Sequence, residues 1–184
     1  MSTTQKITKA ALMLALATVL MWISKIIPAP WLQGGSVTLA SMVPIILTGI
    51  LLGTKWGLCT SLGYSLIQML FGFYPPPTQT FLSFVLVVFL DYILAFGVLG
   101  LSGVFYKLTG KRSFSAAFAG FSVTVLRYIC HIFSGVLIWG VYAEKGQTVL
   151  AYSITYNGTY MVPEIIITTV ILVLIGKMPI FKNM

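Results

Sequence analysis

The chain has 184 residues, of which 58% are hydrophobic and only 8% are charged. Soluble proteins use far more charged residues, and this chain lacks the polar surface that a soluble domain of its length needs. The formal net charge is +8, because eleven lysines and arginines outnumber three acidic residues. The composition therefore excludes an ordinary soluble domain and predicts an integral membrane protein.

Six apolar segments follow one another along the chain, and one membrane crossing needs about 20 residues. Short stretches rich in proline, glycine and lysine separate them. The second segment is short and contains Pro44, so we expect a kinked or partly re-entrant helix there. We predict an all-α integral membrane protein, a compact bundle of six transmembrane helices forming one domain over residues 1–184. The predicted helices cover residues 7–27, 38–53, 55–73, 80–106, 114–142 and 149–175.

The basic residues are distributed unevenly between the two sides of the predicted membrane. If the N-terminus is cytoplasmic, the outer loops carry only Lys145, next to Glu144, and Lys25 lies near the outer end of the first helix. This asymmetry satisfies the positive-inside rule and places both termini in the cytoplasm. The asymmetry also accounts for the positive net charge, which therefore does not indicate a nucleic-acid-binding surface. The basic residues on the inner side are Lys6, Lys9, Lys55, Lys107, Lys111, Arg112, Lys177 and Lys182.

Four ionisable side chains fall in the middle of the predicted membrane. At about 1.5 Å per residue, Asp91 and His131 lie at one depth, whereas Arg127 and Glu164 lie about one turn deeper. Charged groups in a bilayer core are costly and usually pair inside the bundle. The depths therefore predict an Asp91–His131 pair and an Arg127–Glu164 pair, which serve either helix register alone or a binding site.

Polar and aromatic residues beside these charges favour a binding site. They recur at four-residue or similar spacing on one face of each of the last two helices. An aromatic residue near the outer end of a helix is also typical of interfacial anchoring, but a buried amide requires partners. Together the groups predict a site for a flat, heteroaromatic cation. The two stripes are Arg127, His131, Gly135 and Trp139, and Ser153, Asn157, Tyr160 and Glu164, with Tyr152 and Tyr156 nearby.

The sequence does not indicate catalysis. A single histidine cannot form a His-rich metal site, and the chain has neither a G-x-x-x-x-G-K-[ST] nucleotide motif nor a G-x-S-x-G nucleophile motif. A triad of Ser134, His131 and Asp91 would have no evident oxyanion donors. We therefore expect no enzyme activity, no cofactor and no metal, and energy for any transport must come from a partner or an ion gradient.

Three stretches resemble one known family. The stretch LRYICHIFSGVLIWGVYAEKGQTVLAYSITYNGTYMVP is similar to the fifth and sixth helices of thiamine-specific S-components of energy-coupling-factor transporters. The stretches GGSVTLASMVPIILTG and LDYILAFGVLGLSG are similar to the second and fourth helices of the same family. The resemblance covers about residues 34–163. It implies a multi-pass protein of the bacterial plasma membrane that captures thiamine from outside.

The resemblance implies roles for individual residues at the charged end of the ligand. Asp91 falls where the family has an acidic residue that faces the positive thiazolium, and Tyr92 beside it is a further candidate contact. Arg127 occupies a basic position near the acidic one, so it pairs with either Asp91 or Glu164. Trp31 in the first outer loop is a candidate lid residue or an interfacial anchor.

Other roles concern the rings of the ligand. His131 falls at the ligand-contacting histidine of the family, and Trp139 falls at an aromatic stacking position. Gly135 lies between them on the same helix face and is included among the candidate contacts. Tyr152 and Asn157 fall at the tyrosine and asparagine that bind the aminopyrimidine.

The resemblance also implies partners, namely one transmembrane coupling protein and two ABC-type ATPases. In such complexes the first helix packs on the coupling protein through small residues, and Ala11 and Ala15 form a small-xxx-small face that permits close approach. Three alternatives stay open. The chain could bind a related vitamin or thiamine precursor, work alone as a proton-coupled organic-cation transporter through Asp91 or Glu164, or serve only as a structural membrane protein.

Overall fold

The computed structural model describes residues 1–26, 35–110 and 114–178, and these form six helical segments without a strand. The first three are α1 (Thr3–Ser24), α2 (Met42–Leu52) and α3 (Thr54–Gly72). The all-α prediction is therefore confirmed. The predicted second helix begins too early, because the structure starts α2 at Met42 instead of residue 38.

The last three segments are long and end within three residues of the predicted limits. The fourth consists of α4 (Phe81–Val87), η1 (Val88–Leu94), α5 (Ala95–Gly97), η2 (Val98–Leu101) and α6 (Ser102–Leu108). The fifth consists of α7 (Ser115–Ser134), η3 (Gly135–Trp139) and η4 (Gly140–Tyr142). The sixth is α8 (Val149–Gly176). In η1 and η3 the helix widens to a π-helical turn.

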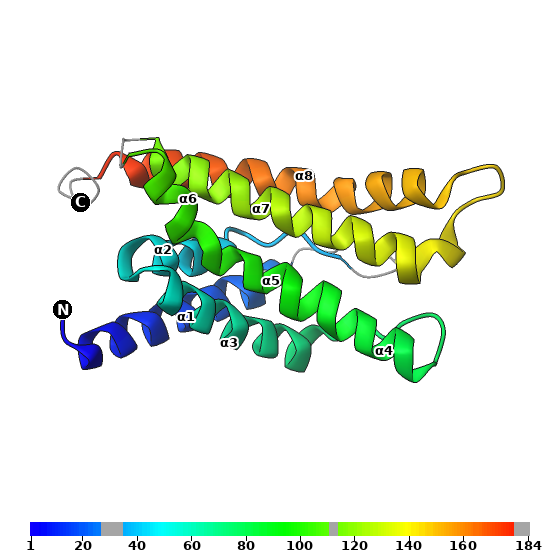
Figure 1. Cartoon of the computed structure of the whole chain (residues 1–184), viewed down its shortest axis with the longest axis horizontal. Helices are drawn as coiled ribbons and strands as arrows, with labels where there is room; N and C mark the ends of the chain where they lie inside the picture. Colours follow the sequence, from blue (N-terminus) through cyan, green and yellow to red (C-terminus); the bar gives the residue numbers. More distant parts are fainter. Residues whose placement is uncertain (27–34, 111–113, 179–184) are drawn as a thin grey trace.

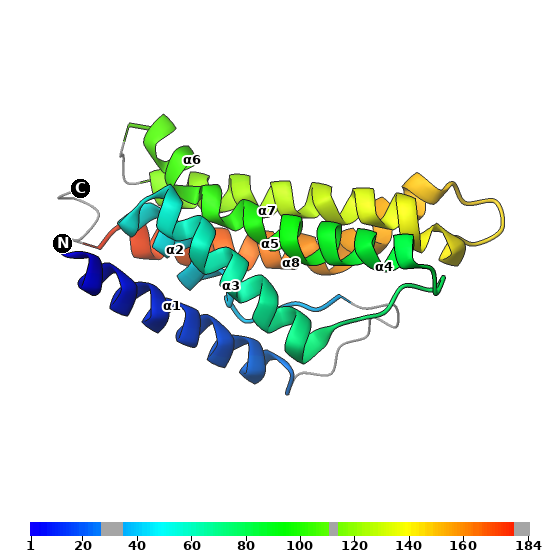
Figure 2. The ribbon, with the colours of Figure 1, turned by 60° about the horizontal axis from the view of Figure 1, so that its bottom comes forward.

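The helices run along one long axis, with α7 and α8 side by side and α1 at the opposite edge against α2 and α3 (Figures 1 and 2). The beginning of α1 and the end of α8 lie at the same end of the bundle, which agrees with an even number of crossings. We call this end the first end. We call the opposite end the pocket end, because the pocket described below lies toward it. The prediction that the first end is cytoplasmic stays a prediction.

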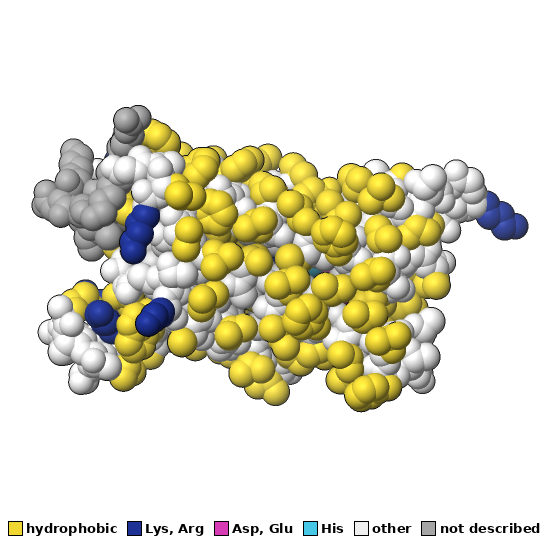
Figure 3. Space-filling model, in the orientation of Figure 1, with side chains coloured by type: hydrophobic (Ala, Val, Ile, Leu, Met, Phe, Trp, Pro, Cys, Tyr) yellow, Lys and Arg dark blue, Asp and Glu magenta, His cyan; other side chains and the backbone are white. Residues whose placement is uncertain are grey.

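The surface and the helix lengths fit a membrane. On the face that Figure 3 shows, hydrophobic side chains cover the middle of the molecule broadly, and lysine and arginine side chains lie near its two ends. By length and composition, α1, the α4–α6 run, the α7–η4 run and α8 can each cross a bilayer. Among these four, α1 is the least buried, which leaves most of its surface for lipid or a partner.

The short helix α2 fills the centre of the first end. Every residue from Met42 to Ile50 is buried. Pro44 is the third residue of α2, where no intrahelical bond uses its missing N–H. The expected kink at this proline is wrong, because the chain before Met42 is not helical and Pro44 lies in the first turn. The alternative, a partly re-entrant helix, stays a prediction.

Glycines close the first end by letting helix backbones meet. A Cβ added to Gly100 in η2 would lie 2.5 Å from the backbone nitrogen of Leu58 in α3. A Cβ on Gly57 would lie 2.6 Å from the carbonyl oxygen of Gly100, and one on Gly103 would lie 2.3 Å from that of Gly49. These contacts leave no room for side chains between α2, α3 and η2, so the open space of the bundle lies elsewhere.

A candidate ligand pocket between four helices

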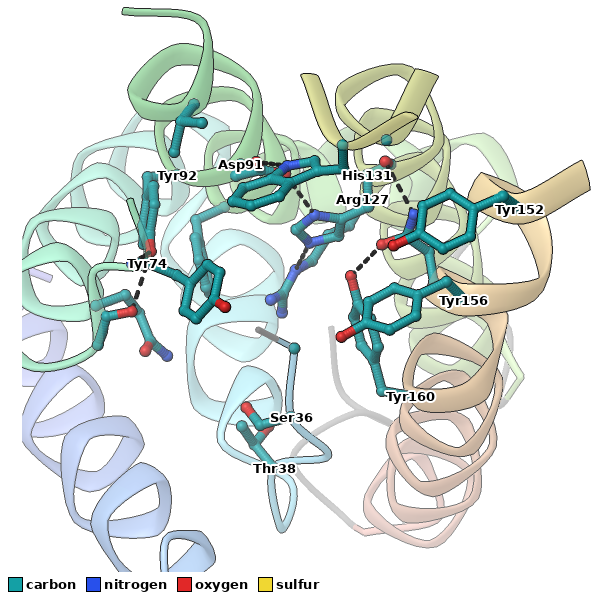
Figure 4. A pocket seen from close by; sticks show the side chains of 18 residues that line it. Ser36, Thr38, Tyr74, Asp91, Tyr92, Arg127, His131, Tyr152, Tyr156 and Tyr160 are labelled. Atoms are coloured by element: carbon teal, nitrogen blue, oxygen red, sulfur yellow. Dashed lines mark hydrogen bonds and ion pairs between the residues drawn. The ribbon is translucent and has the colours of Figure 1, made fainter. Parts of the chain in front are cut away.

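A pocket of about 130 Å³ lies toward the pocket end of the bundle (Figure 4). Its walls come from the non-helical segment before α2, the end of α3, η1, the α7–η3 run and α8. Trp31, one of the nine predicted ligand contacts, lies outside the described residues. The other eight all line the pocket, namely Asp91, Tyr92, Arg127, His131, Gly135, Trp139, Tyr152 and Asn157.

A hydrogen-bond network surrounds Asp91 at the centre of this site. His131 Nδ1 lies 3.0 Å from Asp91 Oδ1, so the predicted Asp91–His131 pair is confirmed. On the other carboxylate oxygen, Ser134 Oγ donates at 2.5 Å and Trp139 Nε1 donates at 3.2 Å. The Asp91 side chain is 15% exposed, so a ligand in the pocket can still reach the carboxylate.

The proton on His131 follows from its other neighbour. Arg127 Nε donates to His131 Nε2 at 3.3 Å, and an arginine can only donate. Nε2 must therefore be an acceptor, which places the ring proton on Nδ1 and directs it to Asp91. The imidazole in this arrangement is neutral and donates to the Asp91 carboxylate, which lines the pocket.

Arg127 contacts neither carboxylate directly among the residues that the structure describes. Its Nη1 lies 2.7 Å from Met42 Sδ, and its guanidinium carbon lies 4.1 Å from the centre of the Phe96 ring. Both predicted pairings of Arg127, with Glu164 and with Asp91, are therefore wrong as ion pairs. The depth count predicted the pairing with Glu164 and the family resemblance allowed the pairing with Asp91, and each fails for its own reason. His131 stands between Arg127 and Asp91, and Glu164 is bound by Thr38 from the segment before α2.

Asn157 connects α8 to α7 as well as lining the pocket. Its Nδ2 lies within 3.1 Å of the backbone oxygens of His131 and Ser153, and Oδ1 accepts from the Tyr160 hydroxyl. An amide oxygen has two lone pairs, so Oδ1 can still accept one hydrogen bond from a ligand amino group. The buried amide is thus satisfied by protein groups, as expected for an asparagine inside a membrane protein.

Aromatic rings form the walls on both sides of the network (Figure 4). Tyr152 and Tyr156 stack with their ring centres 5.6 Å apart, and Tyr74 lies 5.5 Å from Trp139. The Tyr152 hydroxyl is buried and has no hydrogen-bond partner in the described part of the protein. Flat faces next to one carboxylate suit a flat cationic ring, because cations are attracted to aromatic faces.

Backbone irregularities place two parts of the site. Asp91 and Tyr92 lie in η1, and Gly135 and Trp139 lie in η3, the two π-helical turns. Such turns are frequent at functional sites because they redirect side chains. Gly135 also allows α7 to approach α8, since a Cβ there would lie 2.0 Å from Ser153 Oγ.

Sequence reasoning assigned no role to several residues that line the pocket. Ser36 and Thr38 come from the GGSVT stretch, Gln68 comes from α3, and Tyr74 follows α3 in the loop before the prolines. The GGSVT stretch was part of the family resemblance, so it carried a signal for a site. Gln68 and Tyr74 had no pattern that separated them from an ordinary helix end.

Comparisons with known proteins agree on one family. Residues 7–182 match the model of the family described as thiamine transporter protein. The thiamine transporter ThiT of Bacillus subtilis is 40% identical over 154 residues, which are 78% of this chain and 76% of that protein. ThiT of Lacticaseibacillus paracasei is 34% identical over 91 residues, which are 45% of each chain.

A solved structure supports the fold. The structure of ThiT from Listeria monocytogenes matches with a TM-score of 0.72, over 95% of this chain and 94% of that chain. The two sequences are 24% identical in this comparison, so it concerns the fold alone. Together with the match over residues 7–182, the comparisons assign this multi-pass membrane protein to the thiamine transporter family.

Proposed function

We propose that this protein is the thiamine-binding subunit of an energy-coupling-factor importer and takes up thiamine across the bacterial plasma membrane. The single observation that carries the proposal is the pocket-facing carboxylate of Asp91, surrounded by aromatic walls. Thiamine has a permanently charged thiazolium ring and a flat aminopyrimidine ring. Both rings have a matching partner in the pocket.

The Asp91 carboxylate supports a cationic ligand. Asp91 faces the pocket and accepts a hydrogen bond from His131, which is a neutral imidazole in this arrangement. Burying a cation without a counter-charge is strongly unfavourable, so the thiazolium belongs beside Asp91. Arg127 also lines the pocket, where its hydrogen bond to His131 orients the imidazole.

The aminopyrimidine then occupies the side of the pocket formed by α8. Asn157 Oδ1 offers an acceptor for the amino group, and the face of Tyr152 offers a stacking surface, whereas the face of Trp139 lies beside Asp91 and the charged ring. Tyr92 is held in place by two bonds to the end of α3, since its hydroxyl accepts from Tyr74 N and donates to Gly72 O. It therefore shapes the wall next to Asp91 and fixes Tyr74 opposite Trp139.

The partners belong to the same proposal. Ala11 and Ala15 are exposed on α1, so a small-residue face is available for the transmembrane coupling protein. Two ABC-type ATPases bound to that protein would supply the energy. We propose no enzyme activity and no cofactor for this chain, and its ligand is thiamine.

The proposal is tested by identifying what the purified protein carries. Protein purified from cells should release thiamine on denaturation, detected by mass spectrometry in an amount close to that of the protein. Addition of thiamine to ligand-free protein should quench tryptophan fluorescence saturably, because Trp139 lines the pocket. A different vitamin in the extract, together with no quenching by thiamine, would replace thiamine as the ligand.

A further inference from the structure

Glu164 is a buried carboxylate that the ligand pocket does not use. It is 1% exposed, and it is not among the residues that line the pocket. Both of its oxygens accept hydrogen bonds from one residue. Thr38 N donates to Oε2 at 2.6 Å, and Thr38 Oγ1 donates to Oε1 at 2.5 Å. Glu164 in the middle of α8 therefore binds a single residue of the segment before α2.

This segment forms part of the pocket wall. Gly35, Ser36 and Thr38 line the pocket, and no helix includes them. A non-helical segment inside a membrane protein has no backbone ladder, so its polar groups need partners from elsewhere in the protein. Glu164 supplies a partner for the Thr38 N–H, and Thr38 thus contacts the pocket on one side and Glu164 on the other.

Neighbouring contacts hold the same segment at two more points. Leu39 N donates to Ser24 Oγ at 2.6 Å, at the end of α1. Gly35 lies against the Tyr160 ring so closely that a Cβ would be 2.6 Å from it. Tyr160 and Glu164 are four residues apart on α8 and share a face. One face of α8 thus holds both ends of the pocket-lining segment, as well as the Asn157 amide through Tyr160.

Stability of the fold alone would not require an acidic residue at position 164. A buried carboxylate loses its hydration, and an apolar side chain of similar size often supports a fold equally well. An apolar side chain would nevertheless leave the Thr38 N–H without a partner, and an unsatisfied backbone group favours a different position of the segment. The distinctive contribution of Glu164 is therefore the position of Thr38.

We propose that Glu164 is a positioning residue that holds Thr38, and with it the pocket-lining segment Gly35–Thr38, in the geometry that binds the ligand. The inference rests on the proposed function, because the ligand used to test it is thiamine. Glu164 acts through Thr38 and does not touch the ligand.

The test compares the thiamine dissociation constant of purified, folded variants by tryptophan fluorescence. Glu164→Met should raise the constant at least tenfold, because the Thr38 N–H loses its acceptor. Glu164→Gln should stay within about threefold of the parent, because its amide keeps an acceptor for Thr38 N and a donor for Thr38 Oγ1. Rescue by glutamine separates a positioning role from a requirement for the charge.

Thr38→Val provides a second variant if Glu164→Met does not fold. It keeps the shape of threonine and removes the hydroxyl that binds Glu164, so affinity should fall in the parent. Combined with Glu164→Met it should add less than it costs in the parent, because both changes break the hydrogen bond between Thr38 Oγ1 and Glu164. The matched control is Thr168→Val, one turn further along α8, where the buried hydroxyl that is removed has no hydrogen-bond partner among the described residues. Its thiamine affinity should equal that of the parent.

Each outcome is decisive. If the parent fails to bind thiamine, the proposed function is wrong. If the parent binds and Glu164→Met binds equally well, only the positioning role is wrong. Weak binding by Glu164→Gln, equal to that of Glu164→Met, would assign the effect to the negative charge and overturn the role proposed here. So would additive losses from Glu164→Met and Thr38→Val, because Thr38 would then act on the ligand independently of Glu164.

Discussion

The two ends of the bundle are packed differently. At the first end, Gly57 and Gly100 bring the backbones of α3 and η2 into contact, and α2 is buried along almost its whole length. At the pocket end, α7, α8 and η1 surround a polar network around Asp91 and aromatic walls. The contrast teaches that small residues close one half of the bundle, so that larger polar and aromatic groups can frame a cavity in the other. Changes at the two ends should therefore affect different properties.

The largest effect on binding is expected from Asp91→Asn at the pocket end. The substitution keeps the size of the side chain and removes the counter-charge of the bound cation. Thiamine affinity should fall at least a hundredfold, since leaving a buried charge unpaired costs about 3–5 kcal/mol. Isothermal titration calorimetry on the folded variant measures the loss.

A neutral analogue provides the control for this substitution. An analogue with an uncharged ring in place of the thiazolium should lose little affinity for the Asp91→Asn variant, because it needs no counter-charge. Equal losses for thiamine and the neutral analogue would assign Asp91 a structural role through Ser134, His131 and Trp139.

The next effect concerns stability at the first end. Gly100→Ala should destabilise the fold by about 1–3 kcal/mol, because the new methyl group must displace the backbone of α3. Gly97→Ala, one turn earlier, is the matched control, since its Cβ would meet only a Leu62 side-chain atom at 3.7 Å. Thermal unfolding in detergent should show a lower midpoint for Gly100→Ala alone. A normal midpoint would mean that the close packing of this end is not needed.

Asn157→Ala tests a contact that should contribute equally to the binding of charged and neutral ligands. It removes the acceptor for the ligand amino group and leaves the Tyr160 hydroxyl without its Asn157 partner. Affinity should fall about tenfold for thiamine and for the neutral analogue alike, which corresponds to about 1.4 kcal/mol. A loss restricted to thiamine would place the charged ring beside Asn157 and reverse the proposed orientation.

Trp139 should give the smallest change. Trp139→Phe keeps a stacking ring but loses the N–H that donates to Asp91, whereas Trp139→Ala loses both. The alanine variant should bind thiamine about 0.5–2 kcal/mol more weakly, the range expected for a cation–π contact, and phenylalanine should fall between it and the parent. The fluorescence quenching by thiamine should be much reduced in both. Unchanged affinity in the alanine variant would make Trp139 an interfacial anchor.

Much of the fold could be predicted from apolar periodicity and breaks. The predicted limits of the last three helices fall within three residues of the observed ones, because Thr80, Phe114 and Thr148 mark where apolar runs begin. The start of α2 could not be predicted from hydropathy. Residues 38–41 are apolar enough for a helix, but Ala40 has a φ of 64° and Thr38 binds Glu164.

The sequence predicted which residues line the candidate site, but it did not predict all of the pairs that they form. Counting depth along ideal helices brought Asp91 to His131. The same count could not reveal the π-helical turns of η1 and η3, or that a non-helical segment reaches Glu164 before Arg127 does. Pairing of buried groups depends on which backbone donors come near, and these are set by tertiary packing rather than by spacing on one helix.

The central claim is that the pocket binds a cation against Asp91, and a structure of the complex with thiamine tests it most directly. The thiazolium ring should lie within about 4–6 Å of the Asp91 carboxylate, the range over which opposite charges interact strongly, with the aminopyrimidine toward Asn157. Thiamine bound in the opposite orientation, with its charged ring near Asn157 and the pyrimidine at Asp91, would contradict the account.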